Sequence, residues 1–188
     1  MSFFRKTVNV LYEFIEAFVI SASVFVVVYL FLMQPHQVSG SSMFPTFKDK
    51  EYLLTDKITY KRSSPNYGDV IVFKAPIDEN VDFIKRVIAL PGQVVMVKDG
   101  HVYINGLLLE EPYLANTVVT NAGEFLHEGV PYTVQQGEIM TFGDNREHSS
   151  DSRDWGPVPL GNIVGRVFFR YWPPNVAGVI TNPIKTAN

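Results

Sequence analysis

The longest apolar run in the chain lies close to its N-terminus. Residues 17–33 (AFVISASVFVVVYLFLM) contain no charged side chain, and apolar residues at positions 11, 14 and 15 extend the run. At about 1.5 Å per residue, the extended run is long enough for the ~30 Å hydrocarbon layer of a bilayer. It is apolar on all sides, whereas a surface helix of a soluble domain keeps a polar face. We therefore expect a transmembrane anchor over residues 12–33.

The flanks of this run predict its orientation. Arg5 and Lys6 precede it, whereas residues 34–47 contain no Lys or Arg. By the positive-inside rule, residues 1–11 form a short cytoplasmic N-terminus and the chain after Met33 lies outside. The alternative is a cleaved signal peptide, since residues 38–40 (VSG) resemble a small-residue cleavage site. Apolar regions of signal peptides usually cover only ~7–15 residues, which favours an uncleaved anchor.

After residue 33 the pattern changes to short segments that are rich in β-branched and aromatic residues and bounded by Gly or Pro. The clearest are residues 69–73 (DVIVF), 82–90 (DFIKRVIAL) and 162–171 (NIVGRVFFRY). Asp99-Gly100, between two apolar runs, predicts a hairpin, and Asn105-Gly106 predicts the next turn.

The predicted fold class is therefore mainly β: one N-terminal transmembrane helix followed by an antiparallel, partly barrel-like β domain. The β domain covers residues 34–188. Within it, residues 111–137 are poorer in strand signals, so we expect them to form an extended excursion from the core.

Composition narrows the chemistry. The chain has 188 residues, a net charge of −3 and no cysteine. Disulfides and thiolate metal sites are therefore excluded, and nothing suggests nucleic acid as a partner, which would favour a basic patch. The zinc-binding His-Glu-x-x-His pattern does not occur. We expect no metal and no other cofactor, so a hydrolase built from this chain needs an activated hydroxyl.

Serines directly follow the apolar run, in residues 38–47 (VSGSSMFPTF). They form either a flexible linker or a nucleophile held beside a membrane, and position alone does not choose among Ser39, Ser41 and Ser42. A serine nucleophile needs a base within hydrogen-bond reach, because its own pKa leaves the hydroxyl protonated. Histidine or a neutral lysine can supply that base.

Strand alternation places Lys85 on one face of residues 82–90 and Arg86 on the other. Arginine stays charged and cannot act as a base, whereas burial can lower a lysine pKa by up to ~3–5 units. Lys85 is therefore the candidate base. The same pattern also fits two surface cations on an edge strand, where lysine is common.

A second polar cluster covers residues 143–156 (GDNREHSSDSRDWG). It fits either a solvated loop with weak ion pairs or a loop that orients a base and is held by carboxylate–guanidinium pairs. The acid spacing does not match an EF-hand. His148 with Asp144 or Asp151 would suggest a Ser-His-Asp triad, although residues so close together on one loop seldom reach triad geometry.

Taken together, these segments resemble the type I signal peptidases, membrane-bound serine proteases that remove signal peptides from exported proteins. The anchor is followed in the family's order by SGSSMFPT, YGDVIVF, FIKRVIALPG and GDNREHSSDSR, and VYINGLLLEEPYL is also similar to the family. The resemblance implies a Ser-Lys endopeptidase that forms an acyl-enzyme. Matched motif by motif, it implies Ser42 as nucleophile, Lys85 as general base, Ser149 as hydrogen-bond partner of the lysine, and Asp144, Arg146, Asp151 and Arg153 as supports.

The resemblance also implies an oxyanion hole that uses the Ser42 backbone amide. Some family members add a hydroxyl two residues before the nucleophile, but Gly40 occupies that position here. Ala89 and Gln93 depart from the glycine and aspartate that are usual after the lysine, and these two departures affect local turn detail only.

The implied substrates are secretory preproteins with small residues, typically alanine, at the first and third positions before the cut, and the implied surroundings are membrane lipid. We expect the bacterial plasma membrane, with a thylakoid or another organellar membrane as the alternative. A membrane-anchored binding domain and an inactive peptidase homologue remain alternatives, and the presence of Ser42 and Lys85 disfavours both.

Overall fold

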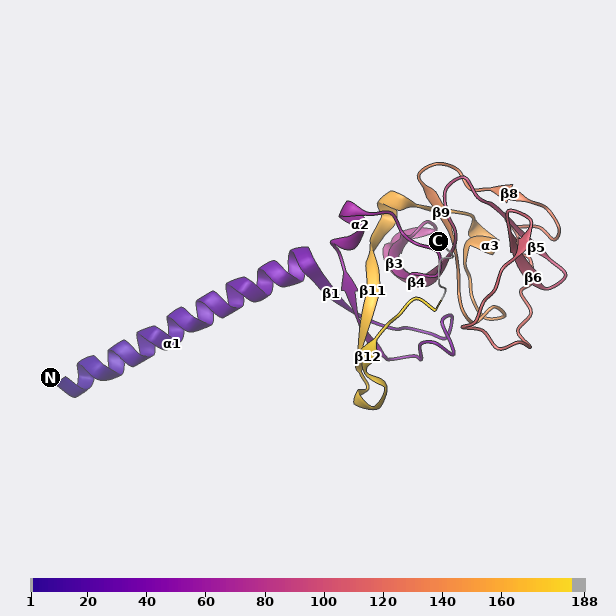
Figure 1. Ribbon diagram of the computed structural model, residues 1–188. Helices are drawn as coiled ribbons and strands as arrows, with labels where there is room; N and C mark the ends of the chain where they lie inside the picture. The colour runs from indigo at the N-terminus through magenta and orange to yellow at the C-terminus, as the bar shows by residue number, and fades with distance from the viewer. Residues whose placement is uncertain (1, 184–188) are drawn as a thin grey trace.

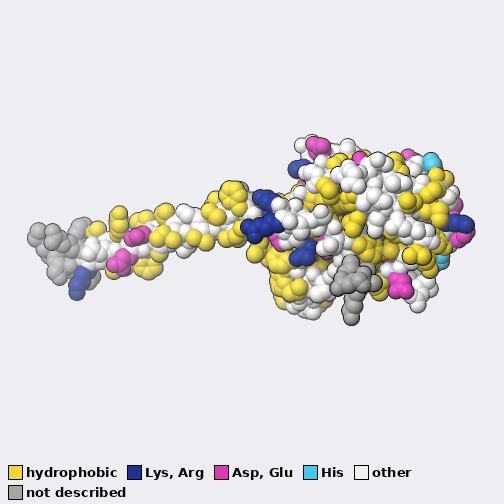
Figure 2. Space-filling view, turned by 45° about the horizontal axis from the view of Figure 1, so that its top comes forward, with side chains coloured by type: hydrophobic (Ala, Val, Ile, Leu, Met, Phe, Trp, Pro, Cys, Tyr) yellow, Lys and Arg dark blue, Asp and Glu magenta, His cyan; other side chains and the backbone are white. Residues whose placement is uncertain are grey.

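The computed structural model describes residues 2–183 of the chain. Helix α1 (Ser2–Val27) extends away from the rest of the protein as a long rod (Figure 1), and hydrophobic side chains lie along its surface (Figure 2). Its Lys6–Val27 portion is long and apolar enough to cross a membrane and is not buried against the rest of the protein. The π-helical segment η1 (Val28–Leu32) follows, and the chain enters strand β1 at Met33, the residue at which the sequence predicts the end of the span.

The larger of two β-sheets has eight strands in the order β1-β2-β11-β3-β4-β9-β10, with β12 paired to β11. All of these pairs are antiparallel. The strands are β1 (Met33–Gln37), β2 (Tyr52–Asp56), β3 (Val70–Ala75), β4 (Asp78–Ala89), β9 (Glu138–Phe142), β10 (Val158–Pro159), β11 (Ile163–Trp172) and β12 (Gly178–Val179).

The second sheet has four strands in the order β7-β6-β5-β8. They are β5 (Val94–Lys98), β6 (His101–Ile104), β7 (Leu107–Leu108) and β8 (Tyr132–Thr133). Asp99 and Gly100 join β5 to β6 with φ values of 51° and 80°, as a two-residue hairpin turn requires. The predicted hairpin is therefore present. Between β7 and β8, residues 109–131 contain no helix or strand.

The remaining helical segments are short: α2 (Thr59–Arg62), α3 (Ser152–Trp155), and the 3-10 turns η2 (Leu160–Asn162) and η3 (Pro174–Val176). The Asp151 side chain caps α3 by accepting a hydrogen bond from the Arg153 amide. The mainly β, antiparallel fold class with one N-terminal apolar helix is thus confirmed.

Strand β4 is central to the larger sheet because it pairs with β3 on one side and with β9 on the other. From Lys85 to Ala89 every residue is buried, and Lys85 and Arg86 are only 4% and 2% exposed. The interpretation of these two cations as surface residues of an edge strand is therefore wrong. Apolar clusters on both sides of the sheet, including Val87 on one side and Ile88 on the other, account for the burial.

Candidate active site

The candidate nucleophile and base meet in a groove of the β domain. The Lys85 Nζ atom donates a hydrogen bond of 2.7 Å to Ser42 Oγ, across 43 positions of sequence. The groove has a volume of about 320 Å³; one wall is formed by residues 37–43 and the other by residues 82–85, with His148 and Ser150 at its edge. Strand β4 positions the lysine, and a turn after β1 positions the serine.

The turn that carries Ser42 is held from several directions. Met43 and Phe47 are buried in the core and fix the segment just after the serine. The Asn145 backbone amide donates to the Ser42 carbonyl at 2.9 Å, and the Asn145 side chain donates to the Ser41 carbonyl at 3.1 Å. Among the described residues, none accepts a hydrogen bond from the Ser42 backbone N–H, so this amide is available to a substrate.

The surroundings of Lys85 favour its neutral form. Burial is the main cause and lowers the pKa of the amine to about 8. The charges of Asp151 and Asp144 act in the opposite direction and raise the pKa, while the Arg153 guanidinium lowers it further by a smaller amount. The nitrogen lies 5.1 Å from the centre of the Phe83 ring, so an apolar surface replaces water on that side. An amine with this pKa is about half neutral near pH 8 and can accept a proton from a hydroxyl.

Ser149 lies next to the turn that carries Ser42. A methyl group at Gly143 would overlap the Ser149 hydroxyl and would lie 2.5 Å from the Ser42 carbonyl oxygen, so only glycine lets these segments approach. Ser149 Oγ is buried and makes no hydrogen bond with another described residue. The bond to Lys85 that the resemblance implies is therefore not formed in this structure.

Asp144 connects the two segments that carry the candidate nucleophile and the candidate base. Its carboxylate accepts two hydrogen bonds from the Arg86 guanidinium, at 2.8 and 2.6 Å, and one from the Thr46 hydroxyl at 2.5 Å. Arg86 adjoins Lys85 on β4, and Thr46 belongs to the turn that carries Ser42. The carboxylate thus connects the strand of the lysine to the turn of the serine.

Asp151 and Arg153 form a second two-bond pair, with distances of 2.8 and 2.9 Å. Asp151 also accepts from the Gly143 amide at 2.9 Å, and Arg153 donates to the Arg146 carbonyl at 2.8 Å. Arg146 binds the carboxylate of Glu111 and donates to the Thr120 hydroxyl at 2.5 Å. The polar loop is therefore held by a buried hydrogen-bond network, and the interpretation as a solvated loop with weak ion pairs is wrong.

Four residues bonded to Asp144 or Arg146 are not singled out by the sequence: Thr46, Arg86, Glu111 and Thr120. The position of Arg86 beside Lys85 is a usable signal, although arginine cannot act as a base. Glu111 and Thr120 lie in the segment with few strand signals, 35 and 26 positions from Arg146, and no local pattern connects them to it.

His148 lines the groove but is exposed, and its side chain makes no hydrogen bond with another described residue. It therefore lacks the contacts to a serine and to an acid that a Ser-His-Asp triad requires. Within residues 2–183, no group of acidic or histidine side chains is arranged to hold a metal ion.

A hydroxyl in contact with a partly neutral amine, beside a free backbone N–H, is suited to acyl transfer through a serine ester. The sequence model of one family, "Signal peptidase, peptidase S26", matches residues 11–172. The chain belongs to this signal peptidase family, and the predicted enzyme class, a serine endopeptidase of the signal peptidase I type, is confirmed.

The names of individual relatives are consistent with this family. Signal peptidase IB of Staphylococcus aureus (strain MRSA252) is 34% identical over 190 residues, which cover 94% of this chain and 98% of that protein. Thylakoidal processing peptidase 1, chloroplastic, of Arabidopsis thaliana is 35% identical over 154 residues, covering 77% of this chain but 43% of that longer protein.

Among solved structures, a crystal structure of a signal peptidase I from Enterococcus faecalis V583 aligns with a TM-score of 0.45 and 28% identity. The alignment covers 55% of this chain and 97% of that one. The family acts on preproteins by removing their signal peptides, and its members are membrane-anchored, which the apolar helix α1 fits.

Proposed function

We propose that this protein cleaves signal peptides from secretory preproteins with Ser42 as the nucleophile and Lys85 as the general base. The observation that carries the proposal is the 2.7 Å contact between Lys85 Nζ and Ser42 Oγ, together with a lysine pKa lowered by burial to about 8. In the ammonium form the lysine donates in this contact. In the neutral form the hydroxyl donates to the nitrogen lone pair.

The reaction then follows in two acyl-transfer steps. Neutral Lys85 takes the Ser42 proton while Oγ attacks the carbonyl carbon of the last signal-peptide residue. The resulting oxyanion accepts a hydrogen bond from the Ser42 backbone N–H. Collapse breaks the peptide bond, and Lys85 returns the proton to the departing amine of the mature protein. Lys85 next takes a proton from a water molecule, whose oxygen attacks the ester carbonyl; the ester bond breaks, Lys85 returns the proton to Ser42 Oγ, and the signal peptide leaves with a new carboxyl group.

The remaining predicted residues position these groups. The free Ser149 hydroxyl next to the serine turn is available to accept a hydrogen bond from the Lys85 ammonium as it forms. Asp144, Asp151, Arg146 and Arg153 hold the loop and the turn at fixed separation through their paired bonds. The groove wall includes Val38, Phe83 and Ile84, and its apolar surface suits the small side chains expected before the cut.

Membrane anchoring brings the site to the substrate. With α1 as a single span, the N-terminus in the cytoplasm and the β domain outside, the chain from Met33 to Ser42 reaches at most roughly 30 Å. The apolar helix of a signal peptide lies in the same bilayer, so its cleavage junction emerges within that distance. We assign the protein to the bacterial plasma membrane, with lipid as its surroundings and secretory preproteins as its partners.

The test is cleavage of a purified preprotein by the detergent-solubilised full chain, with the new N-terminus identified by mass spectrometry. Wild type should cut at the signal junction, while Ser42→Ala and Lys85→Ala should lose nearly all activity. Lys98→Ala is the matched control, because this lysine is exposed on β5, outside the groove. Full activity of Lys85→Ala together with loss in His148→Ala would refute the Ser-Lys assignment.

A further inference from the structure

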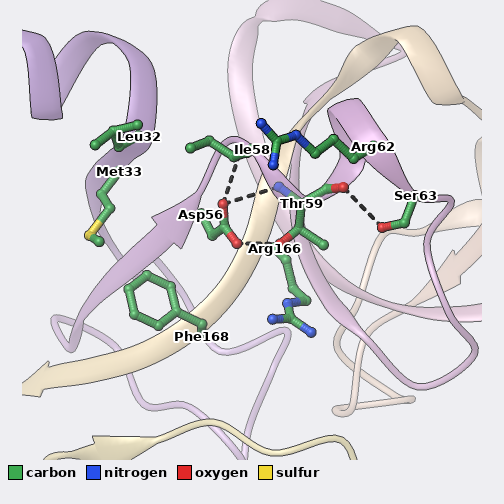
Figure 3. Close-up of a pocket in the computed structure, with 9 residues that line it drawn as sticks. All are labelled: Leu32, Met33, Asp56, Ile58, Thr59, Arg62, Ser63, Arg166 and Phe168. Carbon is green, nitrogen blue, oxygen red and sulfur yellow. Dashed lines mark hydrogen bonds between the residues drawn. The ribbon is translucent and has the colours of Figure 1, made fainter.

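A second cavity lies where the apolar helix joins the β domain. It has a volume of about 580 Å³ and shares no lining residue with the Ser42–Lys85 groove. Its walls come from the end of η1, the start of β1, the end of β2, α2 with the residues beside it, and β11 (Figure 3). None of the catalytic steps above uses it.

One side of this cavity is apolar. Leu32, Met33 and Phe168 lie together on the side where the helix arrives (Figure 3). Leu32 is the last residue of η1, which continues directly from α1. If α1 crosses the bilayer, this apolar side therefore lies at the membrane surface and continues the lipid-facing surface of the helix.

The opposite side carries two cations, the exposed Arg62 and the half-buried Arg166, without hydrogen-bond partners among the described residues. Arg62 and Arg166 lie on either side of Thr59 in the view of Figure 3. Neither guanidinium makes a hydrogen bond or ion pair with another described residue, and the Nε atom of Arg166 is fully buried. A buried guanidinium nitrogen without an acceptor is costly, so an external acceptor is expected.

Asp56, the one carboxylate in the lining, does not fill this role. It accepts hydrogen bonds from the Ile58 amide at 2.7 Å, from the Thr59 amide at 3.2 Å and from the Thr59 hydroxyl. Burial alone would raise its pKa, but these bonds and the Arg166 charge together lower it. The carboxylate is thus occupied in ordering the turn into α2, and two cations remain against one acid.

A further cation adjoins the cavity lining. Lys57 lies between the lining residues Asp56 and Ile58 in the chain, and its backbone amide donates to the Leu32 carbonyl at 3.0 Å. Figure 2 shows Lys and Arg side chains gathered at the base of the long helix. Basic residues beside an apolar surface at a membrane boundary match the charge and polarity of an anionic lipid.

We propose that this cavity binds an anionic phospholipid, with Arg62 and Arg166 contacting the headgroup phosphate and Leu32, Met33 and Phe168 contacting the acyl chains. Guanidinium groups suit phosphate because their planar donors match its oxygens. The proposal rests on the proposed membrane insertion of α1 but not on the Ser42–Lys85 chemistry. A bound lipid would fix the β domain at a set height and tilt above the bilayer.

The experiment is native mass spectrometry of the detergent-solubilised full chain, titrated with phosphatidylglycerol or phosphatidylcholine. We expect wild type to retain one phosphatidylglycerol at least about tenfold more tightly than phosphatidylcholine, and Arg62→Gln/Arg166→Gln to lose that preference. Lys61→Gln is the matched control: it removes a charge from the same helix without touching the cavity lining, and should bind like wild type.

Two further arms identify the ligand and separate the two proposals. Excess inorganic phosphate should not displace the bound lipid; equal competition by phosphate would overturn the lipid assignment. Equal binding of both lipids by wild type, or an equal loss in Lys61→Gln and the double variant, would overturn the site. Cleavage of a short soluble signal-peptide substrate should stay near wild type in the double variant, which also shows that the variant is folded. Absence of cleavage in wild type would refute the proposed function alone.

Discussion

Signal-peptide cleavage by this protein should depend on pH through one group, Lys85. Burial lowers the pKa of the amine from its ordinary 10.5 to about 8, which corresponds to about 3 kcal/mol of destabilisation of the ammonium form. The neutral fraction is then about one half at pH 8 and about one tenth at pH 7, whereas an unperturbed lysine would be well under one hundredth neutral at either pH. The lowered pKa thus supplies roughly a hundredfold more competent base near neutrality.

The assay is kcat/KM for a fluorogenic signal-peptide substrate between pH 6 and 10. The rate should rise about tenfold per pH unit at low pH and level off above about pH 8, because only the neutral amine can accept the Ser42 proton. His148→Ala should leave the profile unchanged. An inflection near 6.5 that disappears in His148→Ala would refute the reasoning, as would a rise that continues to pH 10 without a plateau.

Four other predictions follow from the surroundings of Lys85, Asp144 and Gly143. Lys85→Met should raise the thermal midpoint at pH 7 while abolishing cleavage, since it removes a buried ammonium that is unfavourable by about 3 kcal/mol; an unchanged or lower midpoint contradicts the burial argument. In wild type, Lys85 keeps its proton up to about pH 10.5 in the unfolded state but only up to about pH 8 in the folded state. The free energy of unfolding, measured in denaturant titrations, should therefore increase with pH between about 8 and 10.5. Arg86→Ala should destabilise by about 3–5 kcal/mol in the same titrations because it leaves the Asp144 carboxylate buried without its partner, and a loss below about 1 kcal/mol would argue against this role of the Arg86–Asp144 pair. Gly143→Ala should lower kcat at least about tenfold through displacement of the Ser42 turn, whereas Gly161→Ala, with open space around its Cβ position, should match wild type in the same kinetic assay.

Elements of the fold that depend only on residues close together in the sequence were predictable from that sequence. The hairpin at Asp99-Gly100 follows from the positive φ values that its turn demands and that these residue types tolerate. The strands around residues 69–73, 82–90 and 162–171 follow from β-branched and aromatic content, and the observed β3, β4 and β11 overlap all three. The residue at which the helical segment ends was harder to predict from the sequence, because Met33 is as apolar as the residues before it and yet begins β1.

The burial of β4 could not be predicted from the local sequence pattern. Alternation separated Lys85 from Arg86 but could not reveal that both faces of β4 are covered, because the apolar clusters that cover them are built from distant segments. The Arg86–Asp144 pair joins residues 58 positions apart, and the Arg146–Glu111 pair joins residues 35 apart. Which residues become partners depends on how distant segments are arranged in the fold. The spacing of residues along the chain does not reveal that arrangement.

The sequence by itself determined the apolar anchor, the mainly β character of the rest and the residue types able to serve as nucleophile and base, because hydropathy, turn chemistry and side-chain pKa are local properties. Only the tertiary structure decided that Ser42 and Lys85 touch, that the lysine is desolvated, that Ser149 lies beside the Ser42 turn without a hydrogen-bond partner among the described residues, and that Arg62 and Arg166 line one cavity with the end of the apolar helical segment. Contact and burial arise from segments distant in the chain, and folding brings them together.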